Sequence, residues 1–225
     1  MEAAALTAWH TVHSPAVIAF DDQLGALLLE AIEPGTPLIV TMAYPTLESV
    51  AGLLAALHGQ KVPYGSYPSV AQRVDGLFRS STKLYERDPQ LTEVIPSQLY
   101  ERGHALASAL GQHNGPSVLL HGDLTPRNIL HGGVERGLVA IDPTPCMGDA
   151  AFDAVDLVLW QADDMETIRA RTERLAVESG VDARRLHDWC CAFAGMLALE
   201  LASGGNVPQV RIATLQKLAS KAETT

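Results

Sequence analysis

Cysteine is scarce in this sequence of 225 residues, which contains only Cys146, Cys190 and Cys191. Because two of the three are adjacent, the set can form neither a disulfide framework nor a zinc knuckle. We therefore expect small, reduced core residues and a protein of the cytoplasm.

Long apolar runs and targeting segments are also missing. Glu30 interrupts the first candidate for a membrane-spanning run, and Glu200 interrupts the second. The opening Met-Glu-Ala-Ala-Ala-Leu lacks the basic region and the long apolar region of a secretory signal. The sequence thus predicts a protein that has no membrane partner.

Basic residues are the minority among the charged ones, with 16 Lys and Arg against 26 Asp and Glu, and the formal net charge is -10. An acidic surface repels phosphate backbones, so we expect no nucleic-acid partner, whereas a cationic small molecule would be attracted. The composition, 47% hydrophobic and 19% charged, excludes a disordered polymer and predicts a globular fold.

The order of patterned segments predicts an α+β fold with few strands. After the end of a helix at residues 2–9, apolar runs at 16–20 and 26–32 flank an Asp/Gly turn and predict a hairpin. The second run is nearly continuously apolar, so we expect a buried strand. A Pro/Gly cluster at 33–37 then separates two expected domains, residues 1–33 and 34–225. Helical spacing predicts the helices of the second domain, over residues 47–57, 70–85, 97–110, 163–179 and 182–203, with a last one starting near Pro208.

One short loop, residues 121–128, concentrates the polar side chains that carry chemistry. Its sequence is His-Gly-Asp-Leu-Thr-Pro-Arg-Asn, and apolar pairs bracket it. A strand predicted at residues 137–141 ends at Asp142, which therefore projects toward the neighbouring loop. Phosphoryl transfer needs a carboxylate that accepts the proton of the attacking hydroxyl, together with oxygen ligands for magnesium. Asp123 fits the first role, and Asn128 and Asp142 fit the second.

The segment His121-Gly122-Asp123 through Asn128, followed by Ile141-Asp142-Pro143, resembles the catalytic and metal motifs of the aminoglycoside phosphotransferase family, which has a protein-kinase-like fold. The spacing to Gly148 and to Phe152-Asp153 is most similar to the streptomycin 6-kinase and hydroxyurea phosphotransferase group. The resemblance implies a remnant of the small β lobe in residues 1–33, a helical C-terminal lobe, and ATP and Mg²⁺ as cofactors.

The same resemblance implies an activity and the roles of further residues. The activity is transfer of the γ-phosphoryl group of ATP to a hydroxyl of a small cationic acceptor, such as a streptomycin-like aminoglycoside, and hence antibiotic resistance. The backbone of Glu30, Ala31 and Ile32 would bind the adenine edge, and His121 and Asp153 would support the loop. Three further carboxylates are candidates for an acceptor pocket, with solvated helix ends as the alternative: Asp163, Asp164 and Glu200.

The sequence departs from the family pattern in its first part, where the Gly-rich phosphate loop and the strand with its lysine are absent. The first lysine is Lys61, and Glu2 is the one candidate for the glutamate that pairs with such a lysine. We expect an N-terminally truncated kinase, with a non-catalytic binding module as the alternative. A metallophosphoesterase fragment fits least, because the further metal ligands are missing. No pattern indicates the oligomeric state.

Overall fold

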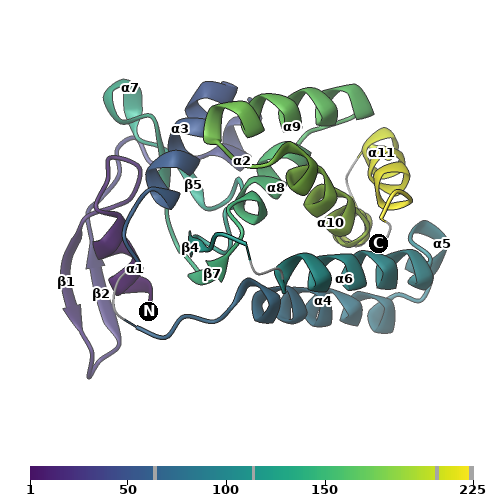
Figure 1. Cartoon of the computed structure of the whole chain (residues 1–225), viewed down its shortest axis with the longest axis horizontal. Coiled ribbons are helices and arrows are strands. Elements are labelled where there is room, and N and C mark those ends of the chain that lie inside the picture. Colours follow the sequence, from purple (N-terminus) through teal and green to yellow (C-terminus); the bar gives the residue numbers. More distant parts are fainter. Residues whose placement is uncertain (63–64, 113–114, 206–207, 223–225) are drawn as a thin grey trace.

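Helices make up most of the chain, and the strands are short (Figure 1). The structure is a computed structural model that describes residues 1–62, 65–112, 115–205 and 208–222. The elements, in chain order, are α1 (Glu2–Trp9), β1 (Val17–Asp21), β2 (Ala26–Leu29), β3 (Thr36–Pro37), α2 (Leu38–Thr41), α3 (Leu47–His58), α4 (Val70–Arg87), α5 (Leu91–Val94), α6 (Ser97–Gly111), β4 (Val118–Leu120), β5 (Ile129–His131), α7 (Gly133–Arg136), β6 (Leu138–Ala140), β7 (Cys146–Gly148), α8 (Ala151–Leu159), α9 (Met165–Ser179), α10 (Ala183–Gly204) and α11 (Gln209–Ala219). The expected α+β class is confirmed.

The long helices lie where sequence periodicity predicts them, and α3, α4, α9 and α10 each begin at a residue whose side chain caps the helix. The side chain of Ser69 accepts the N–H of Gln72, and the Gln72 side chain accepts the N–H of Ser69, which starts α4 with a capping box. The Asp164 side chain accepts the N–H of Thr167, so α9 begins just after it, at Met165. Helix α8 is missed by the sequence patterns, because eight of its nine residues are buried and no polar face gives it a helical period.

The predicted hairpin forms from β1 and β2, but the expected burial of the second strand, β2, is wrong. Leu28 is 56% exposed and Phe20 is 53% exposed. One face of this two-stranded sheet packs on the core through Val17, Leu27 and Leu29, whereas no described element covers the other face. A continuous apolar run predicts burial on both faces, and a two-stranded sheet at the end of the molecule provides it on one (Figure 1).

Two small sheets fix the ends of the polar loop at residues 121–128. Strand β4 enters the loop and pairs with β7, and β5 leaves it and pairs with β6. Strand β3 joins the other edge of β5. The loop is therefore held at both ends by antiparallel hydrogen bonds, and its side chains are presented from a rigid frame.

The main core surrounds α10, which packs against α6, α8 and α11. Trp189, Phe193 and Met196 of α10 are buried there, as their helical spacing predicts. All three cysteines are also buried, as expected. Among the described residues, no helix combines the length and the apolar composition that crossing a membrane requires.

Candidate active site

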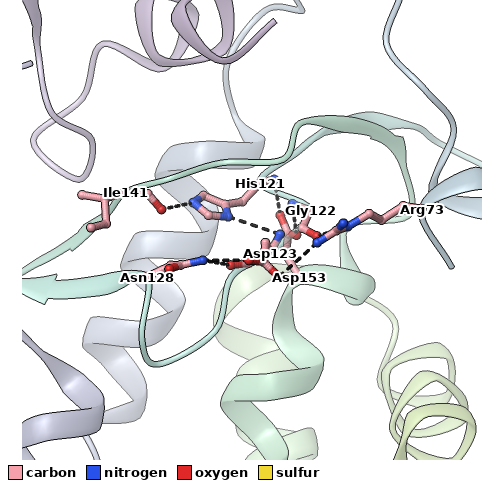
Figure 2. Close-up of polar contacts among 7 residues, drawn as sticks. All are labelled: Arg73, His121, Gly122, Asp123, Asn128, Ile141 and Asp153. Carbon is pink, nitrogen blue, oxygen red and sulfur yellow. Dashed lines mark hydrogen bonds and ion pairs between the residues drawn. The ribbon is translucent and has the colours of Figure 1, made fainter. Parts of the chain in front are cut away.

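Asp153, buried at the start of α8, holds the first residues of the polar loop (Figure 2). Its carboxylate accepts the backbone N–H groups of His121 and Gly122 at 2.7 and 2.9 Å, and Nε2 of His58 at 2.9 Å. Burial raises the pKa of Asp153, but the hydrogen bond and charge of His58, the charge of His121 and the Gly122 N–H together bring that pKa below its ordinary value. Asp153 is therefore an ionised group that binds the first residues of the loop through its carboxylate.

His121 is fully buried, and its two ring nitrogens have backbone partners of opposite polarity. Nε2 donates to the carbonyl of Ile141 at 3.0 Å, and Nδ1 accepts the N–H of Asp123 at 3.4 Å (Figure 2). The ring also stacks on Trp9, with centroids 5.8 Å apart and planes 9° apart. Burial lowers the pKa of His121. The imidazole is therefore neutral, carries its hydrogen on Nε2, and acts as a support of the loop.

Gly122 is the position where the loop tolerates no side chain. Its φ is +77°, and a Cβ atom placed there would lie 2.0 Å from the carbonyl oxygen of Thr144. Thr144 in turn donates its N–H to the carbonyl of His121 at 2.9 Å. Glycine thus lets the segment after β6 cross close over the loop, which aims the next side chain, Asp123, outward.

Asp123 presents its carboxylate at the surface of this frame. Asn128 Nδ2 donates to Oδ2 of Asp123 at 2.8 Å, and Arg73 Nη2 donates to Oδ1 at 3.1 Å. The side chain of Asp123 is 36% exposed, so the carboxylate remains accessible to a further donor. The arrangement can accept a proton from a hydroxyl that approaches from solvent.

Asn128 and Asp142 lie on adjacent strand ends, because the N–H of Ile141 donates to the carbonyl of Asn128 at 2.9 Å. The Asn128 amide points its nitrogen at Asp123, and its Oδ1 accepts no hydrogen bond from the described residues. The Asp142 side chain is exposed and has no hydrogen-bond partner in the described chain. Two unpartnered oxygen groups beside a carboxylate base fit a magnesium ion that takes its other ligands from phosphates and water. Within the described residues, no group of three His, Cys, Asp or Glu side chains could hold a metal ion without such help.

Asp123 opens on a cavity of about 100 Å³ between the loop, α8 and α10. Carboxyl groups and apolar side chains share its lining, the carboxyl groups being those of Asp123, Asp153, Asp156 and Glu200. Burial raises the pKa of Asp156 to about 7, and the charges of Glu200 and Asp123 add to this effect. Burial also raises the pKa of Glu200. The cavity is therefore acidic, and it would favour a positively charged ligand.

Of the three carboxylates expected in an acceptor pocket, the structure brings one to this cavity. Glu200 lines it, whereas Asp163 pairs with Arg211 at 2.8 Å and Asp164 caps α9. Asp163 and Asp164 directly precede α9, and their side chains are engaged in holding helix ends together. For these two residues the alternative reading as helix-end residues agrees with the geometry.

In the expected adenine-binding segment, residues 30–32, the side chain of Glu30 has partners within the described chain, whereas the backbone of the next two residues has none. The Glu30 carboxylate binds Arg136 and accepts the N–H of Ala16. The backbone groups of Ala31 and Ile32, in contrast, have no hydrogen-bond partner among the described residues. An adenine edge needs one donor and one acceptor from the backbone, and this segment offers both.

Sequence reasoning missed two residues of the site, His58 and Arg73. His58 and Arg73 come from helices far from the loop in sequence, and no local pattern relates them to it. Asp156 lies three residues after Asp153, so both share one face of α8. This spacing is the sequence signal that indicates where Asp156 lies.

Comparison with known proteins identifies the relatives of this arrangement. The family described as aminoglycoside/hydroxyurea antibiotic resistance kinase matches residues 2–205. The chain belongs to this family. It is a family of phosphotransferases, and the resemblance inferred from the loop motifs is confirmed.

Individual relatives agree with the family and with the fold. A hydroxyurea phosphotransferase of Kitasatospora aureofaciens is 27% identical over 228 residues, covering 98% of this chain and 64% of that protein. This chain therefore spans less than two thirds of the length of that relative. A choline/ethanolamine kinase family protein from Mesorhizobium loti superposes with a TM-score of 0.63 at 17% identity, covering 96% of this chain and 77% of its own. The GDP complex of aminoglycoside 2'-phosphotransferase-IIIa gives 0.51 at 16% identity, covering 96% and 77%. The kinase-like fold expected from the sequence is confirmed.

Proposed function

We propose that this kinase family member transfers the γ-phosphoryl group of ATP to a hydroxyl of a small cationic acceptor of the aminoglycoside kind. The main support for this proposal is the position of the Asp123 carboxylate, which binds Asn128 and lines an acidic cavity. A base at the entrance of a cavity is well placed to accept a proton from a hydroxyl that the cavity positions within hydrogen-bond reach.

The chemistry balances with the residues present. Asp123 takes the proton of the acceptor hydroxyl as that oxygen forms a bond to the γ-phosphorus, and the bond from the phosphorus to the bridging oxygen breaks to release ADP. Asn128 Oδ1 and the Asp142 carboxylate would hold Mg²⁺, which neutralises charge on the phosphates when bound. The backbone of Ala31 and Ile32 would bind the adenine edge, as its free donors and acceptors support.

The acceptor class follows from the charge of the cavity. Asp156 and Glu200 face the same space as Asp123, and apolar side chains of Phe152 and Phe193 form another part of the wall. A cation would stabilise the ionised forms of the two carboxyl groups that burial disfavours. A neutral acceptor would leave that burial uncompensated, so we propose an ammonium or guanidinium group near the reacting hydroxyl.

The test is transfer of a γ-phosphate label from ATP to a panel of acceptors, some cationic and some neutral, hydroxyurea included. Asp123→Asn should lower turnover by about 100- to 10,000-fold. The matched control is Asp75→Asn, an exposed aspartate of α4 that does not line the cavity, and it should retain full transfer. Equal transfer by wild type and Asp123→Asn would remove Asp123 from the mechanism.

A second candidate function is a binding module that holds an acceptor without transferring phosphate. It is favoured by β1 and β2, whose sequences contain no lysine to bind nucleotide phosphates. Calorimetric titration separates the two functions. Heat on titration of ATP with Mg²⁺ supports the transferase. Heat on titration of a cationic acceptor, with none on titration of ATP and Mg²⁺, supports the binding module.

A further inference from the structure

Arg73, a residue of helix α4, binds the polar loop at residues 121–128. From α4, its Nε donates to the carbonyl of Gly122 at 2.8 Å and its Nη2 donates to Oδ1 of Asp123 at 3.1 Å (Figure 2). The side chain is 22% exposed, so the guanidinium is largely enclosed. One side chain therefore fixes both the backbone before the base and the base itself.

The reach of Arg73 depends on how closely α4 approaches β7. The N–H of Met147 donates to the carbonyl of Pro68 at 2.8 Å, which ties the start of α4 to that strand. A Cβ atom on Gly148 would lie 2.4 Å from Cγ1 of Val70, so only glycine permits this approach. Arg73 lies one turn further along α4, so the close contact between the start of α4 and β7 places its side chain beside the loop.

The two bonds of Arg73 need the shape of a guanidinium. Nε and Nη2 lie on one edge of a planar group, and together they meet a carbonyl and a carboxylate that belong to consecutive residues. A lysine ammonium can occupy this space as a point charge, but it has no fixed pair of donors. The site therefore requires two N–H donors in fixed directions as well as a positive charge.

We propose that Arg73 is a positioning residue for phosphoryl transfer, which sets the orientation of the Asp123 carboxylate toward the acceptor hydroxyl. Asn128 holds one carboxylate oxygen, and Arg73 holds the other. With both oxygens fixed, the remaining lone pairs of Asp123 point in set directions, and the acceptor proton meets one of them. The reaction in this proposal is the one given under the proposed function. The orientation of the Asp123 carboxylate is inferred from the geometry of its hydrogen bonds alone.

The experiment measures kcat and KM of transfer for wild type, Arg73→Met and Arg73→Lys. The matched control is Arg79→Met on the same helix, where Arg79 is exposed and forms no ion pair within the described residues. We expect Arg73→Met to lower kcat about 100-fold, because a displacement of the base by about 1 Å costs this much, with both KM values changed less than about threefold. Arg73→Lys should recover only part of the rate, and added guanidinium ion should raise the rate of Arg73→Met. Arg79→Met should behave as wild type.

The outcomes separate this proposal from the proposed function. A kcat within about threefold of wild type in Arg73→Met, or a loss that guanidinium does not relieve and Arg73→Lys shares fully, overturns the positioning role. Absence of transfer by wild type itself defeats the proposed function. Crystal structures then decide the role of Arg73: an Asp123 side chain that turns to a new rotamer in Arg73→Met supports it, and one that keeps its place overturns it.

Discussion

Nε2 of His58 lies 2.9 Å from Oδ2 of Asp153, although 95 residues separate the two in the chain. The His58 side chain is 9% exposed and that of Asp153 is fully enclosed. The same carboxylate accepts the N–H groups of His121 and Gly122, so helix α3 is connected to the polar loop through one buried anion. Stability and loop geometry therefore depend on a shared group.

His58→Leu should lower the free energy of unfolding by about 3–5 kcal/mol, because it leaves the buried Asp153 carboxylate without one of its partners. The pKa of Asp153 lies below its ordinary value, so the wild type keeps this stabilisation above that ordinary value and loses it as pH falls through the lower native pKa. In His58→Leu the native pKa of Asp153 should lie higher, so the stability lost on acidification should be smaller and should be complete at a higher pH. Urea titrations at several pH values measure both effects.

The exposed pair of His104 and Asp75, at 3.1 Å, is the matched control for this prediction. Asp75→Ala should change the free energy of unfolding by less than about 1 kcal/mol, since solvent screens an exposed pair. Equal effects of His58→Leu and Asp75→Ala would show that the buried anion has another source of stabilisation.

Asp156→Asn should stabilise the fold at high pH. The pKa of Asp156 is raised to about 7, so the unfolded chain binds fewer protons than the native one between pH 4 and pH 7, and wild-type stability falls as pH rises through this window. Removing the charge should raise the free energy of unfolding by about 1–2 kcal/mol at pH 8 and leave it nearly unchanged at pH 4. Urea titrations at the two pH values measure the difference, with the exposed Glu86→Gln as a control that should show none.

Gly122→Ala should abolish the native loop. The new Cβ would meet the carbonyl oxygen of Thr144 at 2.0 Å at a φ of +77°, and we expect a loss of about 3 kcal/mol or more in unfolding free energy. Gly52→Ala is the matched control, because nothing lies within 4 Å of its added Cβ on an exposed helix position. It should stabilise the protein by about 0.5–1 kcal/mol. Thermal unfolding of the two variants with opposite shifts in Tm checks the prediction.

Arg136→Met should loosen the N-terminal part of the chain. Arg136 donates to the carbonyls of Val12 and Ser14 and pairs with Glu30, which ties residues 12–30 to α7. We propose that residues 1–33 respond as a unit, and amide exchange in β1 and β2 should become about tenfold faster. Arg174→Met, which breaks an exposed pair with Glu178 on α9, is the control. Exchange in the hairpin that stays at the wild-type rate in Arg136→Met would contradict the proposal.

The helices and the reactive loop could be predicted from the sequence, because both rest on local signals. The capping residues Ser69 and Asp182 mark helix starts, and apolar spacing marks the buried faces. The run from His121 to Asn128 concentrates polar residues between apolar pairs, a pattern that local order alone reveals. Burial of β2 was beyond such signals, since it depends on which layers cover the hairpin.

Tertiary packing decided which side chains meet around that loop. His58 and Arg73 come from two helices that are distant from the loop in sequence, and only the approach of α3 and α4 brings them to Asp153 and Asp123. Likewise, packing sent Asp163 to Arg211 and Glu200 to the cavity, although both are carboxylates near helix ends. Local hydrogen bonds such as helix caps join residues that are a few positions apart. The partners of a buried charge can be distant in sequence, because the fold brings them together. The pKa values and the acidity of the cavity are therefore properties of the folded protein.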